Sequence, residues 1–174
     1  MIASLDILAE ALRYPSPGSL DTLRQRLEEV DRETVRADLS AFLAEIERMP
    51  LEAWEELYVR SFDLDPDAAP YVGWQVWRDE QRRAELLMEM TRRLSERGVD
   101  LDGELPDHLV PVLRYLARSP ETPDRETPLL DQALAPALAG IVRSLRSSAE
   151  RNPYIHVLEG VAKALGLPEE GRSA

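Results

Sequence analysis

Apolar residues recur at helical spacing along almost the whole chain, and this pattern limits the possible fold more than any other feature. Residues three and four positions apart share one face of an α-helix, so each apolar stripe predicts an amphipathic helix. About eight such stripes occur, and no long segment alternates with period two as a half-buried strand would. The sequence therefore predicts an all-α fold, a single-domain helical bundle of about eight helices over residues 1–168, with a short polar tail at 169–174.

Prolines and glycines separate the stripes. Gly98 and Gly166 are expected to end helices, and Asn152 with Pro153 is expected to begin the last one. Pro136 would kink a helix if it lay inside one. Loops are expected at 63–70 and 119–128, and the stripes cover 2–12, 20–30, 35–49, 54–62, 86–94, 109–116, 130–145 and 157–165.

Charge and composition exclude several classes of function. The chain has 33 acidic and 21 basic residues, a formal net charge of −12, which argues against nucleic acid as a partner. An acidic surface attracts basic partners, although plain solvation of the surface explains the same charge. The chain has no cysteine, so disulfides, thiol catalysis and thiolate zinc sites are excluded.

Nothing in the sequence predicts export or a membrane span. No basic region precedes an apolar stretch at the N-terminus. The longest apolar run, 133–142, is interrupted by Pro136 and Gly140 and falls short of the roughly 20 residues that a span needs. We expect a cytoplasmic protein without direct membrane insertion.

The first candidate site is the stretch Glu104-Leu-Pro-Asp-His-Leu109. Pro106 is expected to open the sixth helix, which would place Asp107 and His108 in its first turn and Glu104 just ahead. An acid at a helix start favours the helix dipole, so simple capping is one interpretation. A cap alone would not need Glu, Asp and His together, and the alternative is a binding site beside the apolar face that starts at Leu109.

Two aromatic segments are further candidates. Tyr58 and Phe62, one helical turn apart, precede Asp63; Phe62 suits the core, whereas the Tyr58 hydroxyl suits a groove. Segment 70–77 places Tyr71, Trp74 and a second tryptophan on an expected loop in a chain that has few aromatics. A recognition surface and a plug for the core both fit this cluster.

Signatures of catalysis are missing from the sequence. It has no Gly-rich phosphate loop, HExxH motif, nucleophile elbow or EF-hand, and the alternating acids at 63–67 lack the glycine and distal glutamate of a calcium loop. His108 and His156 stand alone, and such histidines more often bond backbone or carboxylate than a metal. We expect no enzyme activity, metal or cofactor. A further hypothesis is that titration of His108 near pH ~6.5 tunes release of a ligand.

Several of these segments resemble the NarJ/TorD/DmsD family of redox-enzyme maturation chaperones, most closely the NarJ-type nitrate reductase molybdenum cofactor assembly chaperones. The Glu104–Leu109 stretch followed by Tyr115 and Leu116 is the most specific match. The segment after Asp63 departs from the family pattern. The remaining matches are Leu12-Arg13-Tyr14-Pro15, Tyr58 with Phe62-Asp63, and residues 134–165.

The resemblance implies a chaperone that binds the N-terminal region of an apo molybdoenzyme catalytic subunit and assists insertion of the molybdenum cofactor. The client would belong to nitrate reductase or a related reductase. Its N-terminal segment would be basic and amphipathic, which suits an acidic groove. A monomer or a helix-swapped dimer fits the family. The residues expected to bind the client are Tyr58, Phe62, Asp63, Tyr71, Trp74, Glu104, Pro106, Asp107, His108, Leu109 and Tyr115.

Two alternatives remain open at this point. A helical protein that binds a small molecule or nucleotide would need cationic or backbone donors for phosphate, and no glycine-rich helix start supplies them. A generic helical protein-interaction module would need only the acidic, partly apolar surface.

Overall fold

A computed structural model describes residues 2–118, 127–148 and 150–167. Within these ranges the chain forms nine α-helices and one π-helical turn, η1, and no β-strand. The predicted all-α bundle is therefore confirmed. The elements are α1 (Ile2–Ala11), α2 (Ser19–Leu27), α3 (Glu33–Ile46), α4 (Leu51–Tyr58), η1 (Val59–Asp63), α5 (Val72–Trp77), α6 (Gln81–Glu96), α7 (Leu109–Ala117), α8 (Pro128–Ser147) and α9 (Tyr154–Leu165).

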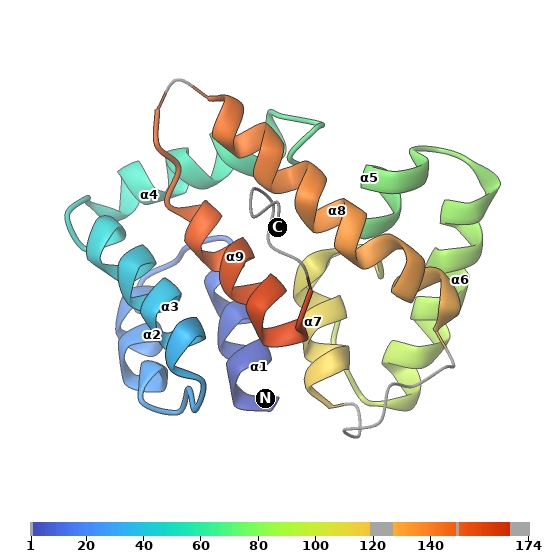
Figure 1. The fold of residues 1–174 in the computed structure, drawn as a ribbon, viewed down its shortest axis with the longest axis horizontal. Coiled ribbons are helices and arrows are strands. Elements are labelled where there is room, and N and C mark those ends of the chain that lie inside the picture. Colours follow the sequence, from blue (N-terminus) through green and yellow to red (C-terminus); the bar gives the residue numbers. More distant parts are fainter. Residues whose placement is uncertain (1, 119–126, 149, 168–174) are drawn as a thin grey trace, which may run out of the picture.

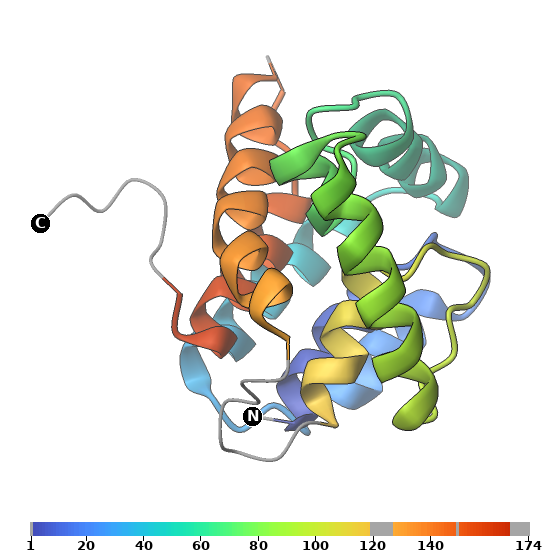
Figure 2. The same ribbon diagram turned by 90° about the vertical axis from the view of Figure 1, so that its right-hand side faces the viewer.

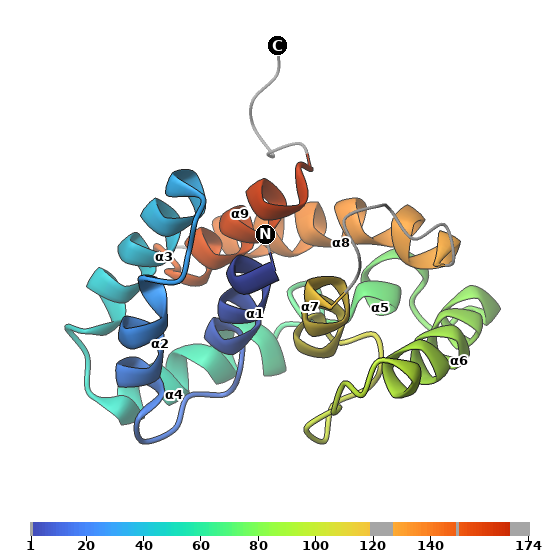
Figure 3. The same ribbon diagram turned by 90° about the horizontal axis from the view of Figure 1, so that it is seen from below.

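Three helix pairs hold the bundle together: α1 with α7, α3 with α9, and α5 with α8. Figures 1 and 3 show α2 and α3 at one end of the molecule, α6 at the other, and α1, α7 and α9 between them. Figure 2 views the α6 end, where the short α5 lies between α6 and α8. One continuous core of buried apolar side chains runs through this arrangement.

Most predicted helix ends are confirmed. Gly98 and Gly166 have φ of 60° and 68°, the left-handed conformation that glycine adopts after a helix. α9 begins one residue later than predicted, with Pro153 as its N-cap, and Asn152 supports this start because its Oδ1 accepts a hydrogen bond from the Tyr154 N–H at 3.0 Å. α8 continues through Pro136 as a single helix.

The structure differs from the sequence prediction between residues 63 and 77. The fourth stripe ends in η1, whose Leu64 N–H bonds the Val59 carbonyl at 3.0 Å, an i to i+5 bond that defines a π-turn. Residues 72–77, expected as loop, form α5. The expected loop at 119–128, except for Thr127 and Pro128, and the tail at 169–174 lie outside the described residues.

Among the helices that the structure describes, none combines the length and apolar character that a membrane span requires.

Candidate functional site

The Glu-Leu-Pro-Asp-His-Leu stretch lies ahead of α7 and not inside its first turn. α7 begins at Leu109, and its N-cap is His108, whose Nδ1 accepts a hydrogen bond from the Val110 N–H at 3.1 Å. The prediction that Pro106 opens this helix is therefore wrong. Pro106 instead takes the second position of a turn closed by the His108 N–H and the Leu105 carbonyl, 3.0 Å apart, where its fixed φ is also favoured.

Backbone hydrogen bonds join this turn to the start of α5. One pair of bonds, 2.8 Å each, links residues 70–72 to residues 107–109. The pair flanks an isolated antiparallel bridge between Tyr71 and His108, whose rings meet edge to face with centroids 5.1 Å apart. Two segments that the sequence analysis singled out are thus neighbours in space.

Asp107 fastens the turn to α5 and α6. Its side chain has no exposed surface, and Oδ2 accepts a hydrogen bond from the Arg83 Nε at 3.0 Å. Gly73 makes room, because a Cβ there would lie 2.9 Å from both Asp107 Oδ2 and Arg83 Cγ. The second carboxylate oxygen, Oδ1, is buried and has no hydrogen-bond partner in the described part of the chain. Asp107 is therefore a structural ion-pair partner that does not face solvent.

Six other predicted site residues are also buried: Tyr58 and His108 border a hollow described below, and four lie in the interior. Phe62 and Leu109 belong to the apolar core. Tyr115 is fully buried, and the Arg97 guanidinium lies 4.2 Å from its ring centroid. Pro106 is buried in its turn. In this conformation these four side chains support the surface and do not form it.

A hollow of about 120 Å³ opens beside the turn, between the end of α1, the end of α4 and the start of α7. Three predicted site residues line it directly. A fourth, Tyr71, reaches it through its hydroxyl, which donates to Glu104 Oε2 at 3.0 Å. We call it the acidic hollow, and its lining residues are Arg13, Tyr14, Tyr58, Asp102, Glu104, His108 and Val110.

Two charged residues that line the acidic hollow, Arg13 and Asp102, belong to an ion-pair network with Glu10 and Arg114. Arg13 lies 3.2 Å from Glu10 and 3.8 Å from Asp102. Asp102 is also paired with Arg114, which in turn lies 3.5 Å from Glu10. These two arginines and two acids form a closed network without excess charge.

Glu104 and Asp63 are left without a cationic partner among the described residues. Beside Glu104 lie the Tyr71 hydroxyl and, at 4.0 Å, the His108 Nε2. Partial desolvation and then the negative charge of Glu104 raise the pKa of Asp63, an exposed residue, above its ordinary value. Burial and Glu104 likewise raise the pKa of Tyr71 to about 12. Desolvation is the larger cause of both shifts, and the charge of Glu104 adds to it; a cation bound beside Glu104 would offset that charge.

His108 carries no charge that offsets Glu104. Burial lowers the pKa of His108 to about 4, because a desolvated imidazolium is disfavoured. Since Nδ1 accepts the bond from Val110, the neutral ring has its proton on Nε2. The hypothesis that titration of His108 near pH ~6.5 tunes release is therefore not supported.

The aromatic segment of α5 does not act as one surface. Trp74 is half-buried, donates from Nε1 to the Pro66 carbonyl at 2.9 Å, and does not line the acidic hollow. Guanidinium groups of Arg78 and Arg83 lie 5.0 and 5.5 Å from its ring centroid. Trp77 is buried. Tyr71 is thus the member of this segment that reaches the hollow.

Sequence reasoning missed four residues that line the hollow, Arg13, Tyr14, Asp102 and Val110. Tyr14 is 51% exposed and packs edge to face on Tyr58, with centroids 5.3 Å apart. The sequence did offer one signal for Tyr14, because an aromatic residue next to Pro15 and Pro17 lies where a helix ends and a side chain is often exposed. The sequence offered no such signal for Asp102, because this residue lies in a turn that comes close to the end of α1 only in the folded protein.

One cluster has the composition of a metal site but is already satisfied. Ligand atoms of Asp38, His156 and Glu159 lie within 4.8 Å of one another. Both carboxylate oxygens of Asp38, however, accept hydrogen bonds of 2.8 Å from Lys163, the single lysine of the chain. The ammonium takes the place that a cation would occupy, so this cluster joins α3 to α9.

Comparison with known proteins agrees with the resemblance noted above. No curated protein matches the chain. A family model, the nitrate reductase delta subunit, matches residues 22–150, which is most of the chain and includes the Glu104–Leu109 turn together with α5 and α6. The protein therefore belongs to the nitrate reductase delta subunit family, whose members are assembly chaperones of molybdoenzymes and not catalytic subunits.

Proposed function

We propose that this protein binds the basic N-terminal segment of an apo molybdoenzyme catalytic subunit, and that the acidic hollow takes one basic side chain of that segment. The observation that carries the proposal is Glu104, which lines the hollow and lacks a cationic partner in the described structure. Asp63, outside the lining and also without such a partner there, lies close enough for its charge to interact with that of Glu104. Unbalanced like charges destabilise the free protein, and a bound lysine or arginine would remove that cost.

The surroundings of these two acids suit a cation on an apolar stem. Tyr14 and Tyr58 line the hollow, and aromatic faces attract guanidinium and ammonium groups. Leu64 and Leu105, each next to one of the two acids in sequence, are 71% and 48% exposed. An amphipathic segment would place its basic residue in the hollow and apolar residues against these two leucines.

In this proposal the buried members of the predicted site position the hollow. Asp107 and Leu109 hold the turn that carries Glu104, and Phe62 packs beneath Tyr58, with ring centroids 5.2 Å apart. Binding would precede cofactor insertion and any export of the client, so we place it in the cytoplasm. Net negative charge on the whole chain would speed the encounter with a basic segment.

Calorimetric titration tests the proposal, with a peptide that spans the N-terminal region of the catalytic subunit from the same organism. Replacing Glu104 by Gln removes one charge and keeps the shape, and we expect affinity to fall about tenfold, the usual loss for one charge-assisted contact. Glu28→Gln, at an exposed acid on α2's C-terminal side, is the matched control and should leave affinity unchanged. Equal affinity of wild type and Glu104→Gln would refute the site.

A further inference from the structure

A larger hollow, of about 330 Å³, lies between the end of α3, the side of α4 and η1, and the start of α9. Three arginines line it, Arg48, Arg60 and Arg151, together with two acids, Glu45 and Glu150. We call it the arginine hollow. Three guanidinium groups against two carboxylates leave one positive charge, in a chain whose net charge is −12.

These arginines are available to a ligand. Within the part of the chain that the structure describes, the Arg48 side chain makes no hydrogen bond or ion pair. Arg60 lies 3.5 Å from Glu150, and these two side chains are 60% and 77% exposed. An ion pair so open to solvent contributes little to stability and exchanges readily. Arg151 is 71% exposed and shares Glu45, at 3.3 Å, with the ring of His156.

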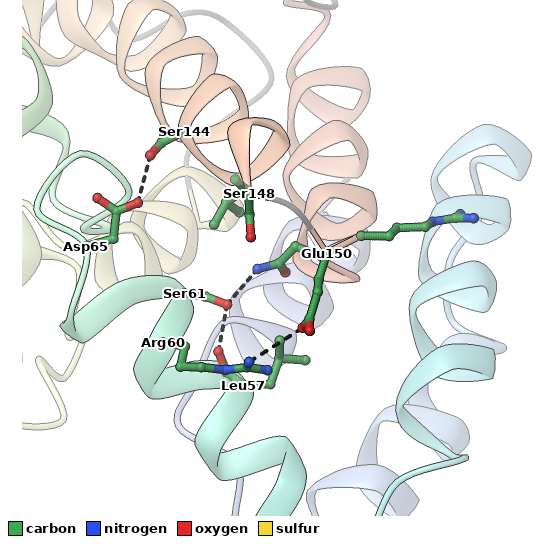
Figure 4. A pocket seen from close by; sticks show the side chains of 10 residues that line it. Leu57, Arg60, Ser61, Asp65, Ser144, Ser148 and Glu150 are labelled. Atoms are coloured by element: carbon green, nitrogen blue, oxygen red, sulfur yellow. Dashed lines mark hydrogen bonds and ion pairs between the residues drawn. The ribbon is translucent and has the colours of Figure 1, made fainter.

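The walls behind these arginines are already organised. A smaller hollow of about 130 Å³ adjoins the larger one and shares Arg60, Glu150, Arg151 and Leu57 with it. Figure 4 shows this smaller hollow from close by. In it, the Ser61 hydroxyl donates to the Leu57 carbonyl at 2.6 Å and accepts from Asn152 Nδ2 at 2.7 Å. These buried bonds fix η1 against the start of α9, so the two sides of the arginine hollow do not depend on a ligand for their positions.

We propose that the arginine hollow binds an acidic side chain of a partner polypeptide together with an adjoining apolar side chain. Guanidinium groups bind a carboxylate through paired N–H donors, and the exposed Glu150 now takes up part of this donor capacity at Arg60. The rest of the lining is apolar, from Met49, Ala53, Leu57 and Pro153. Charge and shape thus fit an acid that is followed by an aliphatic residue.

A free phosphate group fits this hollow less well than a carboxylate. The excess of one positive charge balances a carboxylate, whereas a phosphate dianion would meet Glu45 and Glu150 with a charge left over. Phosphate sites also rely on backbone N–H groups of glycine-rich turns, and no glycine lines the hollow. This site is separate from the acidic hollow, so it is tested independently of the client peptide.

The test uses the full-length protein, labelled with ¹⁵N, and a designed peptide with the sequence AELLAELLA, acetylated and amidated so that its two Glu side chains are its sole carboxylates. Backbone amide shifts are followed during titration at physiological salt, where screening limits repulsion by distant acids. We expect saturable shifts at Leu57, Arg60 and Arg151. Arg48→Gln should weaken binding about fivefold to tenfold. Arg82→Gln, at an exposed arginine on α6, is the control and should not weaken it.

Two further titrations separate this proposal from its rivals. The peptide AQLLAQLLA keeps the apolar residues and lacks the carboxylates, and it should give no saturable shifts at these amides. If it binds as well as the acidic peptide, the hollow is only an apolar contact and the proposal fails. Inorganic phosphate should not compete. If phosphate produces the same shifts and displaces the peptide, the site binds free oxyanions and the assignment to a polypeptide is wrong.

Discussion

Removing the Asp107 carboxylate should destabilise the protein without removing a surface contact. In the substitution Asp107→Ala, the Arg83 guanidinium loses the acceptor that now lies 3.0 Å from its Nε. The Arg83 side chain is 14% exposed, so water replaces that acceptor incompletely. The turn ahead of α7 also loses its side-chain link to α6, and the two backbone bonds to residues 70–72 remain.

The size of the loss in stability depends on the interactions that Arg83 keeps after the substitution. Breaking a fully buried ion pair by removing one partner costs about 3–5 kcal/mol. Arg83 keeps Asp79 at 3.6 Å and lies 5.5 Å from the Trp74 ring centroid, so its charge is not left wholly uncompensated. We therefore expect a loss of about 2–3 kcal/mol in the free energy of unfolding. For a chain of this length that corresponds to a fall in Tm of about 5–10 °C.

A double-mutant cycle with Arg83→Met measures the interaction itself. Urea unfolding of wild type, both single variants and the double variant should give a coupling energy of about 2 kcal/mol. The matched control is Asp67→Ala, which breaks the exposed pair with Arg78, 2.7 Å apart, and should cost no more than about 1 kcal/mol. A coupling energy below about 0.5 kcal/mol would show that the ion pair between Asp107 and Arg83 does not stabilise the turn.

Three further predictions concern other charged groups. The pKa of Asp63 is raised in the folded state, so the folded protein binds more protons than the unfolded chain at pH values around that pKa, and its stability falls as pH rises through them. Asp63→Asn should therefore raise Tm slightly at neutral pH, lose this gain below the ordinary pKa of aspartate, and weaken client binding. A lower Tm at neutral pH would contradict the assignment. Arg78 has φ 50° and ψ −124°, a strained conformation for any side chain, so Arg78→Gly should melt above Arg78→Ala by calorimetry, the reverse of the usual order. An NMR titration of His108 should find it neutral down to a pKa of about 4, and a value above about 6 would revive the hypothesis of pH-tuned release.

The helical periodicity predicted the bundle because each long helix buries a stripe that its own sequence displays. α5 escaped prediction because six residues are too few to show a period, and its position depends on contacts with residues distant in sequence. Its backbone start is fixed by residues 107–109, and its side packs against α8. Neither contact is visible in the residues of α5 themselves.

Only part of the candidate site could be predicted, again because contacts between residues distant in sequence decide the rest. Glu104, Tyr58 and Tyr71 stand out in this sequence as acids and aromatics, and the structure brings them together at a hollow, whereas their contact with a client stays a prediction. Asp107 was expected beside them at the surface, yet Arg83, which is 24 residues earlier, covers it. Which carboxylate of a cluster is buried depends on such a distant partner, and local pattern does not reveal the partner.

Net charge proves a poor guide to what the individual sites bind. The total of −12 favours basic partners at long range, and the acidic hollow agrees with it. The arginine hollow, on the same α4–η1 segment, has the opposite local sign. Salt screens attraction beyond about 8 Å, so binding at each hollow depends on the few charges that line it. Groups that lack an oppositely charged partner among the described residues, such as Glu104 and Arg48, therefore determine the chemistry of a ligand, whereas the overall charge determines mainly how fast a partner arrives.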